Sequence, residues 1–202
     1  MMTMENINVS RETMDKLSGF VALVEKWTAK INLISKSSIP DIWQRHILDS
    51  VQIFDLAPAG GHWVDLGSGG GFPGIVIAIL TQDTDIPHQV TLVESDLRKG
   101  TFLRAAIREL ELQARVISDR IEKCDPLHAD ILSARALADL EKLLNHTERH
   151  LSPQGTALFP KGAQWQQEDA AARRLWSYDC EAVTSKTNPE AAILKIKEIK
   201  RV

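Results

Sequence analysis

The sequence has little of what a disulfide-stabilised or membrane-spanning protein needs. Its 202 residues include only two cysteines, Cys124 and Cys180, which lie far apart and form no CxxC pair. A disulfide framework and a cysteine-rich zinc site are therefore not expected. The low cysteine content instead predicts a reducing compartment. The longest apolar run, residues 75–80, is far shorter than the roughly 20 residues that cross a bilayer. The N-terminus also lacks the apolar stretch of a signal peptide, so the sequence predicts a soluble, cytoplasmic protein with no membrane contact.

Neither sign of charge is in large excess. There are 24 Lys and Arg residues against 27 Asp and Glu residues, for a formal net charge of -3. This balance argues against a polybasic nucleic-acid-binding chain, although a local basic patch is compatible with it. Apolar residues make up 44% and charged residues 25%, as in ordinary globular domains. The length favours one domain with an extension.

Apolar periodicity predicts an N-terminal helical extension, residues 1–60, before a larger domain at 61–202. One helix should begin after an N-cap at Ser10, and a second should open at Ser38 and Pro40. Beyond a linker at 57–61, strands and helices alternate. Strands are expected at 62–66, 89–93, 114–117, 129–133, 156–159, 182–185 and 192–199. Helices are expected at 75–80, 96–110, 137–150 and 164–176, with Leu97 facing inward in the second of them.

This order indicates an α/β fold with a mostly parallel sheet, whose two closing strands could pair antiparallel as a hairpin.

A glycine-rich segment, residues 65–74, follows the first strand and precedes a helix. Its Gly69-x-Gly71-x-x-Gly74 spacing formally fits a dinucleotide-binding loop. The overlapping Gly67-x-Gly69-x-Gly71 pattern after Asp65 is typical of methyltransferases that use S-adenosylmethionine (SAM). Glu94 closes the next strand, where a carboxylate can accept hydrogen bonds from both hydroxyls of a ribose.

The SAM interpretation is favoured over a nicotinamide-dependent oxidoreductase. The only tyrosine, Tyr178, has Ala182 four residues on, so the chain lacks a Tyr-x-x-x-Lys pair. A glycine-rich turn without any ligand is the third interpretation.

Several motifs together resemble a known family. They are Asn32-Leu33, the string RHILDS at 45–50, the glycine segment with its Phe-Pro-Gly tail, Ser133-Ala134-Arg135-Ala136 and Lys161-Gly162. In these the chain resembles the bacterial small-subunit rRNA guanine-N7 methyltransferase G family, also called glucose-inhibited division protein B. The resemblance implies a class I SAM-dependent methyltransferase fold: a Rossmann-like, mostly parallel seven-stranded sheet with an antiparallel terminal strand. It also implies SAM as cofactor, S-adenosylhomocysteine as product, and no metal.

The resemblance also implies where the ligands bind. Cofactor contacts are expected at Asp65, Gly67, Gly69, Gly71, Phe72, Glu94, Asp119, Ile121, Glu122 and Arg135. RNA contacts are expected at Asn32, Arg45, His46, Arg135 and Lys161. Ordinary structural roles compete with these assignments. His46 could simply pack, Arg45 could pair with Asp49 one helical turn on, and Lys161 could be a surface lysine.

The implied reaction is methylation of a guanine N7 in 16S rRNA. Because N7 carries a lone pair and no proton, no general base is required, and catalysis can rest on positioning. Arg135, His46 and Lys161 are therefore interpreted as groups that hold a phosphate or guanine O6. The expected partner is 16S rRNA in the small ribosomal subunit or an assembly intermediate, bound by a monomer. A SAM-dependent enzyme for another RNA or a small molecule, and a non-catalytic RNA-binding module, are the remaining alternatives.

Overall fold

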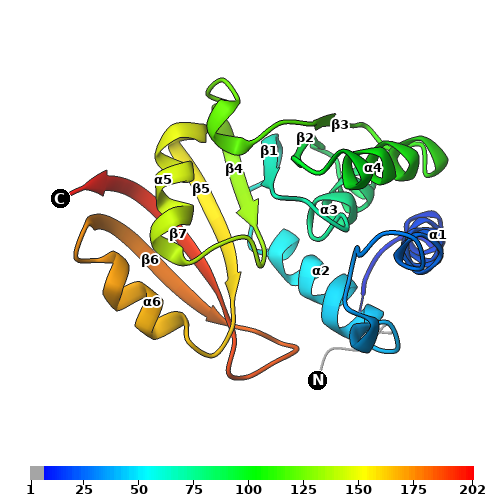
Figure 1. Ribbon diagram of the computed structural model, residues 1–202, viewed down its shortest axis with the longest axis horizontal. Coiled ribbons are helices and arrows are strands. Elements are labelled where there is room, and N and C mark those ends of the chain that lie inside the picture. Colours follow the sequence, from blue (N-terminus) through cyan, green and yellow to red (C-terminus); the bar gives the residue numbers. More distant parts are fainter. Residues whose placement is uncertain (1–6) are drawn as a thin grey trace.

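A computed structural model describes residues 7–202 of the chain. Its centre is a seven-stranded sheet in the order β3-β2-β1-β4-β5-β7-β6 (Figure 1). The strands are β1 (Gly61–Leu66), β2 (His88–Val93), β3 (Ala114–Ile117), β4 (Ala129–Ala134), β5 (Leu151–Lys161), β6 (Trp176–Thr184) and β7 (Ala192–Arg201). The first five strands pair in parallel, whereas β7 runs antiparallel to both β5 and β6. This is the predicted class I methyltransferase topology, including the closing hairpin.

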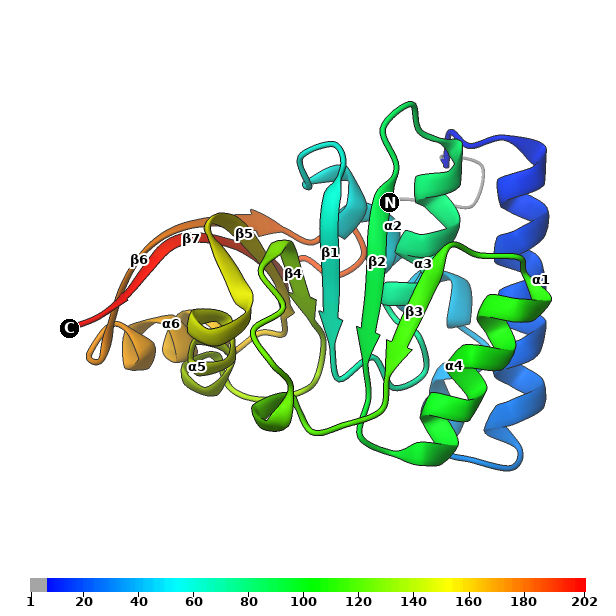
Figure 2. The same cartoon turned by 90° about the horizontal axis from the view of Figure 1, so that it is seen from above.

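The helices divide into two groups around this sheet. They are α1 (Arg11–Thr28), α2 (Leu48–Asp55), α3 (Gly74–Leu80), α4 (Leu97–Glu109), α5 (Leu140–His150) and α6 (Trp165–Ala172). Figure 2 shows α3 and α4 beside β1–β3 with α1 packed outside them, while α5 and α6 accompany β4, β5 and β7. The carboxyl ends of the parallel strands therefore form one edge, at which the glycine loop and residue 135 emerge.

The N-terminal helices pack on the main domain. The Ser10 hydroxyl caps α1 as predicted, accepting a hydrogen bond from the Thr13 amide at 3.2 Å. The buried side of α1, with Leu17 and Val24, shares one apolar core with α3 and with Trp63 of β1. The division of the chain at residue 60 stays a prediction, and β1 begins at the next residue.

The sequence predicted that the second helix opens at Ser38, but the structure places its start later in the chain. A 3-10 turn covers Lys36–Ser38, a wide π-helical turn covers Trp43–Ile47, and only then does α2 begin. The Ser38 hydroxyl donates to the Ser35 carbonyl at 2.8 Å, which offers the backbone an alternative to the helix. The π-helical turn carries the predicted residues Arg45 and His46. Such turns often occur at functional sites.

Two helix boundaries in the C-terminal half were predicted wrongly. Helix α5 begins at Leu140 and not at residue 137, because the Asp139 carboxylate accepts from the Lys142 amide at 3.0 Å and fixes the N-cap. Helix α6 ends at Ala172, because Trp176 opens β6 and pairs with β7. Tertiary strand pairing overrides the helical pattern here.

Strand lengths and one side chain also differ from the prediction. Strand β5 spans 151–161, because its start pairs with β4 and its end pairs with β7. Strand β6 begins at residue 176, well before the predicted start at 182, because it pairs with β7 from that residue on. Leu97 was expected to face inward, but its position at the first turn of α4 leaves it 70% exposed.

The start of α3 depends on a glycine. A Cβ at Gly74 would lie 2.7 Å from Asp65 Oδ2 and would collide with the buried side chain of Leu92. We expect Gly74→Ala to destabilise the protein by about 2 kcal/mol or more, because this site cannot relax without moving β1 or β2. Urea unfolding measures the loss. Gly162→Ala is the matched control, since its new methyl group would meet no atom within 4 Å; equal stabilities of the two variants would contradict the expectation.

Candidate functional site

Glu94 ties the glycine loop to the end of β2. Its Oε2 accepts from the Gly69 amide and its Oε1 from the Asp96 amide, each at 2.8 Å. The residue is 8% exposed. Each carboxylate oxygen has a further lone pair, so the group can accept additional hydrogen bonds. Glu94 therefore lies at the carboxyl edge of the sheet, as predicted, and orients the loop that follows β1.

The glycine loop needs glycine for its backbone shape. Gly67, Gly69 and Gly71 have φ values of 65°, 51° and 85°, which side-chain-bearing residues rarely adopt. A Cβ at Gly71 would also lie 2.9 Å from the Phe20 ring, and one at Gly70 would lie 3.0 Å from the Leu33 carbonyl. The loop is thus wedged against α1 and the segment after it, and it presents bare backbone beside Glu94.

Asp65 lies beneath this loop. Its Oδ1 accepts from the Ser133 hydroxyl at 2.7 Å, and the Trp63 indole donates to the same hydroxyl at 2.9 Å. The residue is 1% exposed, and no hydrogen bond in the described chain reaches Oδ2. Burial raises the pKa of Asp65 to about 6, and the bond from Ser133 limits the rise. The side chain links β1 to β4 through its hydrogen bond with Ser133. A cofactor contact by Asp65 stays a prediction.

The raised pKa of Asp65 makes stability depend on pH. Its value of about 6 in the folded protein exceeds the usual value near 3.9 in an unfolded chain. The contribution of this carboxyl is therefore complete below about pH 4 and is lost as pH rises through about 6. We expect Asp65→Asn to abolish this loss, so that the stability of the wild type relative to the variant falls between pH 4 and 7. The fall should be about 3 kcal/mol.

Urea unfolding of both proteins at several pH values tests this expectation. Asp41→Asn, at an exposed carboxyl, controls for the loss of one negative charge. Parallel stability profiles for the wild type and Asp65→Asn would refute it.

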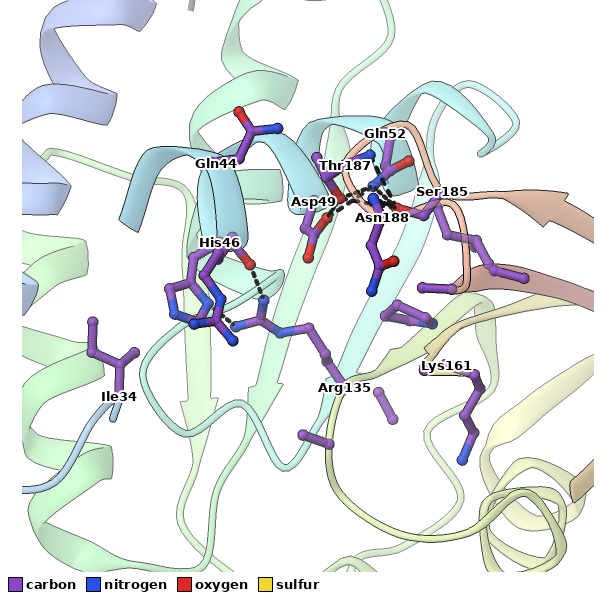
Figure 3. A pocket seen from close by; sticks show the side chains of 18 of the residues that line it. Ile34, Gln44, His46, Asp49, Gln52, Arg135, Lys161, Ser185, Thr187 and Asn188 are labelled. Carbon is purple, nitrogen blue, oxygen red and sulfur yellow. Dashed lines mark hydrogen bonds between the residues drawn. The ribbon is translucent and has the colours of Figure 1, made fainter. Parts of the chain in front are cut away.

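A cavity of about 850 Å³ opens at the same sheet edge, next to the glycine loop (Figure 3). Its walls come from the π-helical turn and α2, from the ends of β4 and β5, and from the turn between β6 and β7. Polar side chains that line it include Arg45, His46, Asp49, Gln52, Arg135, Lys161, Thr187 and Asn188. Four of the five residues predicted to contact RNA are thus close to or in the walls of one cavity.

Arg135 and His46 form the wall nearest to Phe72. Arg135 Nη2 donates to His46 Nδ1 at 2.8 Å, and Nη1 donates to the Arg45 carbonyl at 3.2 Å. The guanidinium carbon lies 5.2 Å from the centre of the Phe72 ring, on which His46 stacks at 4.8 Å. An arginine can only donate, so His46 Nδ1 is the acceptor and the imidazole proton resides on Nε2.

His46 is a neutral group in this arrangement. Burial, followed by the charges of Arg135 and Arg45, lowers the pKa of His46 to about 3. Its Nδ1 lone pair is occupied by Arg135, and its Nε2–H is buried with no partner in the described chain. These features suit a hydrogen-bond donor and not an acid–base catalyst.

Asp49 does not pair with Arg45. The i,i+4 spacing of these residues had suggested an ion pair on the helix surface, and that interpretation is wrong. Asp49 Oδ1 instead accepts from Gln52 Nε2 at 3.0 Å and from the Thr187 hydroxyl. Gln52 is itself held by the β6–β7 turn, accepting from the Lys186 amide at 2.9 Å. The sequence prediction missed Asp49, Gln52 and Thr187 as site residues. The available signal was that Asp49 lies in the RHILDS string at 45–50; no motif pointed to Gln52 or Thr187.

Lys161 has a buried partner. Its Nζ donates to Glu168 Oε2 at 2.7 Å and to the Ala138 carbonyl at 2.8 Å, and the residue is 9% exposed. Glu168 also accepts from the Leu140 amide at 2.8 Å. The ammonium thus joins α6 to the start of α5, and the surface-lysine interpretation does not hold. An RNA contact by Lys161 stays a prediction. It would require the ammonium group to contact RNA while it is also paired with Glu168.

The remaining predicted residues surround the loop and the end of β3. Asn32 is exposed, one residue before Leu33. Asp119 and Glu122 are exposed and Ile121 is partly buried. Their segment is anchored to Glu94 through the Glu94 amide, which donates to the Ile117 carbonyl at 3.0 Å. Their cofactor contacts stay predictions.

The described residues include neither a metal-binding cluster nor a membrane-spanning helix. Within residues 7–202, no three His, Cys, Asp or Glu side chains are grouped to hold a metal ion. No helix in that range combines the length and apolar character needed to cross a membrane.

Comparison with known proteins places this arrangement in a family. The family model for rRNA small subunit methyltransferase G matches residues 13–194. The chain is 54% identical to ribosomal RNA small subunit methyltransferase G of Ruegeria sp. (strain TM1040) and 56% identical to that of Ruegeria pomeroyi. Each alignment covers 97% of this chain and 96% of the relative.

A solved structure shows the same fold at much lower identity. The TehB-like SAM-dependent methyltransferase from Corynebacterium glutamicum superposes with a TM-score of 0.58 at 17% identity, over 87% of this chain and 98% of that one. The fold, the extent of the family match and the identity to full-length relatives agree. The chain belongs to the rRNA small subunit methyltransferase G family.

Proposed function

We propose that this protein transfers a methyl group from SAM to N7 of a guanine in 16S rRNA. Membership of the rRNA small subunit methyltransferase G family carries the proposal. The geometry supports it, because a polar cavity opens beside a glycine loop anchored by a carboxylate. One ligand can thus lie along the loop and a second can enter from the cavity.

The residues around the loop fit SAM. Gly67 and Gly69 leave backbone without Cβ atoms, and Glu94 keeps lone pairs for the ribose hydroxyls after accepting two amides. In this proposal Gly67, Gly69, Gly71, Phe72 and Glu94 hold SAM, and residues 119–122 border its adenine. When bound, SAM supplies a sulfonium methyl group that a nitrogen lone pair can take by in-line displacement, which leaves S-adenosylhomocysteine.

The protein's own residues position the base and need not move a proton. Neutral guanine N7 has a lone pair and no hydrogen, so no general base is required. The Nδ1 lone pair of His46 is occupied by Arg135, and the guanidinium of Arg135 can only donate, so neither is free to act as a base. Because the methylated ring gains positive charge, Arg135 and His46 should contact O6 or a phosphate and not N7. Orientation of this kind can supply about 7–11 kcal/mol.

The acidic overall charge bears on the substrate. A net charge of -3 gives little nonspecific attraction to RNA. Recognition should therefore depend on folded RNA shape. We propose the small ribosomal subunit or an assembly intermediate as the substrate, a monomer as the acting species, and the cytoplasm as the place of action, since ribosomal RNA is there.

The decisive experiment compares rRNA from cells with and without the protein. Mapping of N7-methylguanine should reveal one site in 16S rRNA that disappears in the deletion strain. Purified protein and labelled SAM should restore it on subunits from that strain. Methylation elsewhere would favour another substrate, RNA binding without transfer would favour a non-catalytic module, and binding of NAD in place of SAM would favour an oxidoreductase.

A further inference from the structure

Two acids line the cavity, and each accepts hydrogen bonds on one carboxylate oxygen only; Glu168 is neutralised by its ion pair with Lys161, whereas Asp49 has no such ion pair among the described residues. The Thr187 hydroxyl and Gln52 Nε2 both donate to Oδ1. No hydrogen bond in residues 7–202 is made to Oδ2. Gln52 is fixed by Ser185 and by the Lys186 amide, so the β6–β7 turn holds the carboxylate from behind. In Figure 3 the side chain of Asp49 faces the cavity from above.

Positive charge lies beside this carboxylate in the same cavity. Arg135 and Asp49 are close enough to affect each other electrostatically. Among residues 7–202, however, no ion pair within 4.0 Å joins them. The cavity therefore has a fixed polarity, with a carboxylate held by the β6–β7 turn and a guanidinium held by His46 and the Arg45 carbonyl.

Guanine matches this polarity and the other bases do not. Its Watson–Crick edge carries two adjacent donors, N1–H and N2–H₂, followed by the O6 acceptor. Adenine places an acceptor at N1 and a donor at position 6, and uracil and cytosine lack two adjacent donors. The unused oxygen Oδ2 of Asp49 has two lone pairs and can accept from both of these donors. Enzymes that modify a base commonly take it out of its stack and read this edge.

We propose that Asp49 selects guanine by accepting hydrogen bonds from N1–H and N2–H₂ of the target base, an inference that rests on the proposed function. Its free oxygen and its anchoring by Thr187 and Gln52 carry the argument. Burial also raises the pKa of Asp49, as expected of a carboxyl short of donors until a base supplies them.

The same contact should accelerate the reaction. When N7 takes the methyl group, positive charge spreads over the ring and its N–H groups become stronger donors. Hydrogen bonds to Asp49 therefore strengthen toward the transition state, and only such interactions raise the rate of the chemical step. Loss of Asp49 should lower the single-turnover rate more than it weakens substrate binding.

The test measures single-turnover methyl transfer from labelled SAM to reconstituted small subunits whose target position holds guanosine or inosine, which lacks the N2 amino group. Wild type should be about 10- to 100-fold slower on inosine, the loss expected for one hydrogen bond to a charged group. Asp49→Asn should be slowed by at least that factor on guanosine, and its guanosine-to-inosine ratio should approach one. Asp55→Asn, at an exposed carboxyl on the same helix, should match wild type on both.

The outcomes separate the two proposals. A variant that is merely misfolded slows both substrates equally and keeps the wild-type ratio, which would overturn the role of Asp49. Equal wild-type rates on guanosine and inosine would also overturn it, and that arm needs no variant. If wild type transfers nothing to guanosine subunits, the proposed function fails and the role of Asp49 fails with it.

Discussion

Replacing Glu94 with alanine is expected to weaken SAM binding by about 100-fold or more. Two effects add. The ribose loses a charged acceptor for its hydroxyls, at roughly 1.5–3 kcal/mol per bond. The Gly69 and Asp96 amides also lose the carboxylate that orients the loop. Calorimetric titration with SAM and S-adenosylhomocysteine measures the affinity.

Glu94→Gln distinguishes charge from shape. Its amide nitrogen would have to face one of the two backbone N–H groups, donor against donor, so we expect a loss almost as large as for alanine. Glu25→Gln, at an exposed position on α1, is the control for a lost carboxylate and should bind SAM like wild type. An affinity for Glu94→Gln within a few-fold of wild type would show that this residue does not hold the ribose.

The glycine loop and Glu94 could be predicted because their signals are local in the sequence. The glycines follow β1 directly and Glu94 closes β2, so the parallel pairing of these strands brings them to one edge. The alternation of strands and helices predicted the sheet for the same reason. Where one strand follows another through a helix, topology leaves few choices.

The cavity could not be predicted in the same way, because its walls meet only in three dimensions. Asp49 and Gln52 are in α2, whereas Thr187 comes from the turn between the last two strands. In the sequence Asp49 has a nearby basic residue, Arg45, and the i,i+4 spacing favours a surface pair. The π-helical turn that ends at Ile47 was also invisible to a pattern based on a period of 3.6 residues.

Lys161 shows how a family motif and a structural role can coincide. The sequence is compatible with either an RNA contact or a free surface lysine at this position. In the structure the side chain is buried in an ion pair with Glu168. Removing one partner of such a pair leaves the other charge buried and costs stability. A loss of activity in a Lys161 variant would therefore not by itself indicate an RNA contact, whereas Arg135 offers a cleaner test.

Arg135→Ala is expected to lower the rate of methyl transfer by about 100-fold or more while changing SAM affinity only a few-fold. The guanidinium fixes His46 through Nδ1, holds the Arg45 carbonyl and covers Phe72. Without it the imidazole can rotate, and the cavity loses the positive wall that faces O6. Misplacement of a base by about an ångström can itself cost about 100-fold.

Arg135→Lys should rescue little of this loss, because a lysine cannot donate to His46 and to the Arg45 carbonyl from one planar group. Single-turnover transfer to unmethylated subunits, with SAM affinity measured in parallel, tests the split between rate and binding. Arg174→Ala, at an exposed site beyond the end of α6, serves as the matched control. Wild-type transfer by Arg135→Ala would remove Arg135 from the reaction. A SAM affinity that falls as far as the rate would instead place Arg135 on the cofactor, so the two measurements decide which of its two predicted contacts matters.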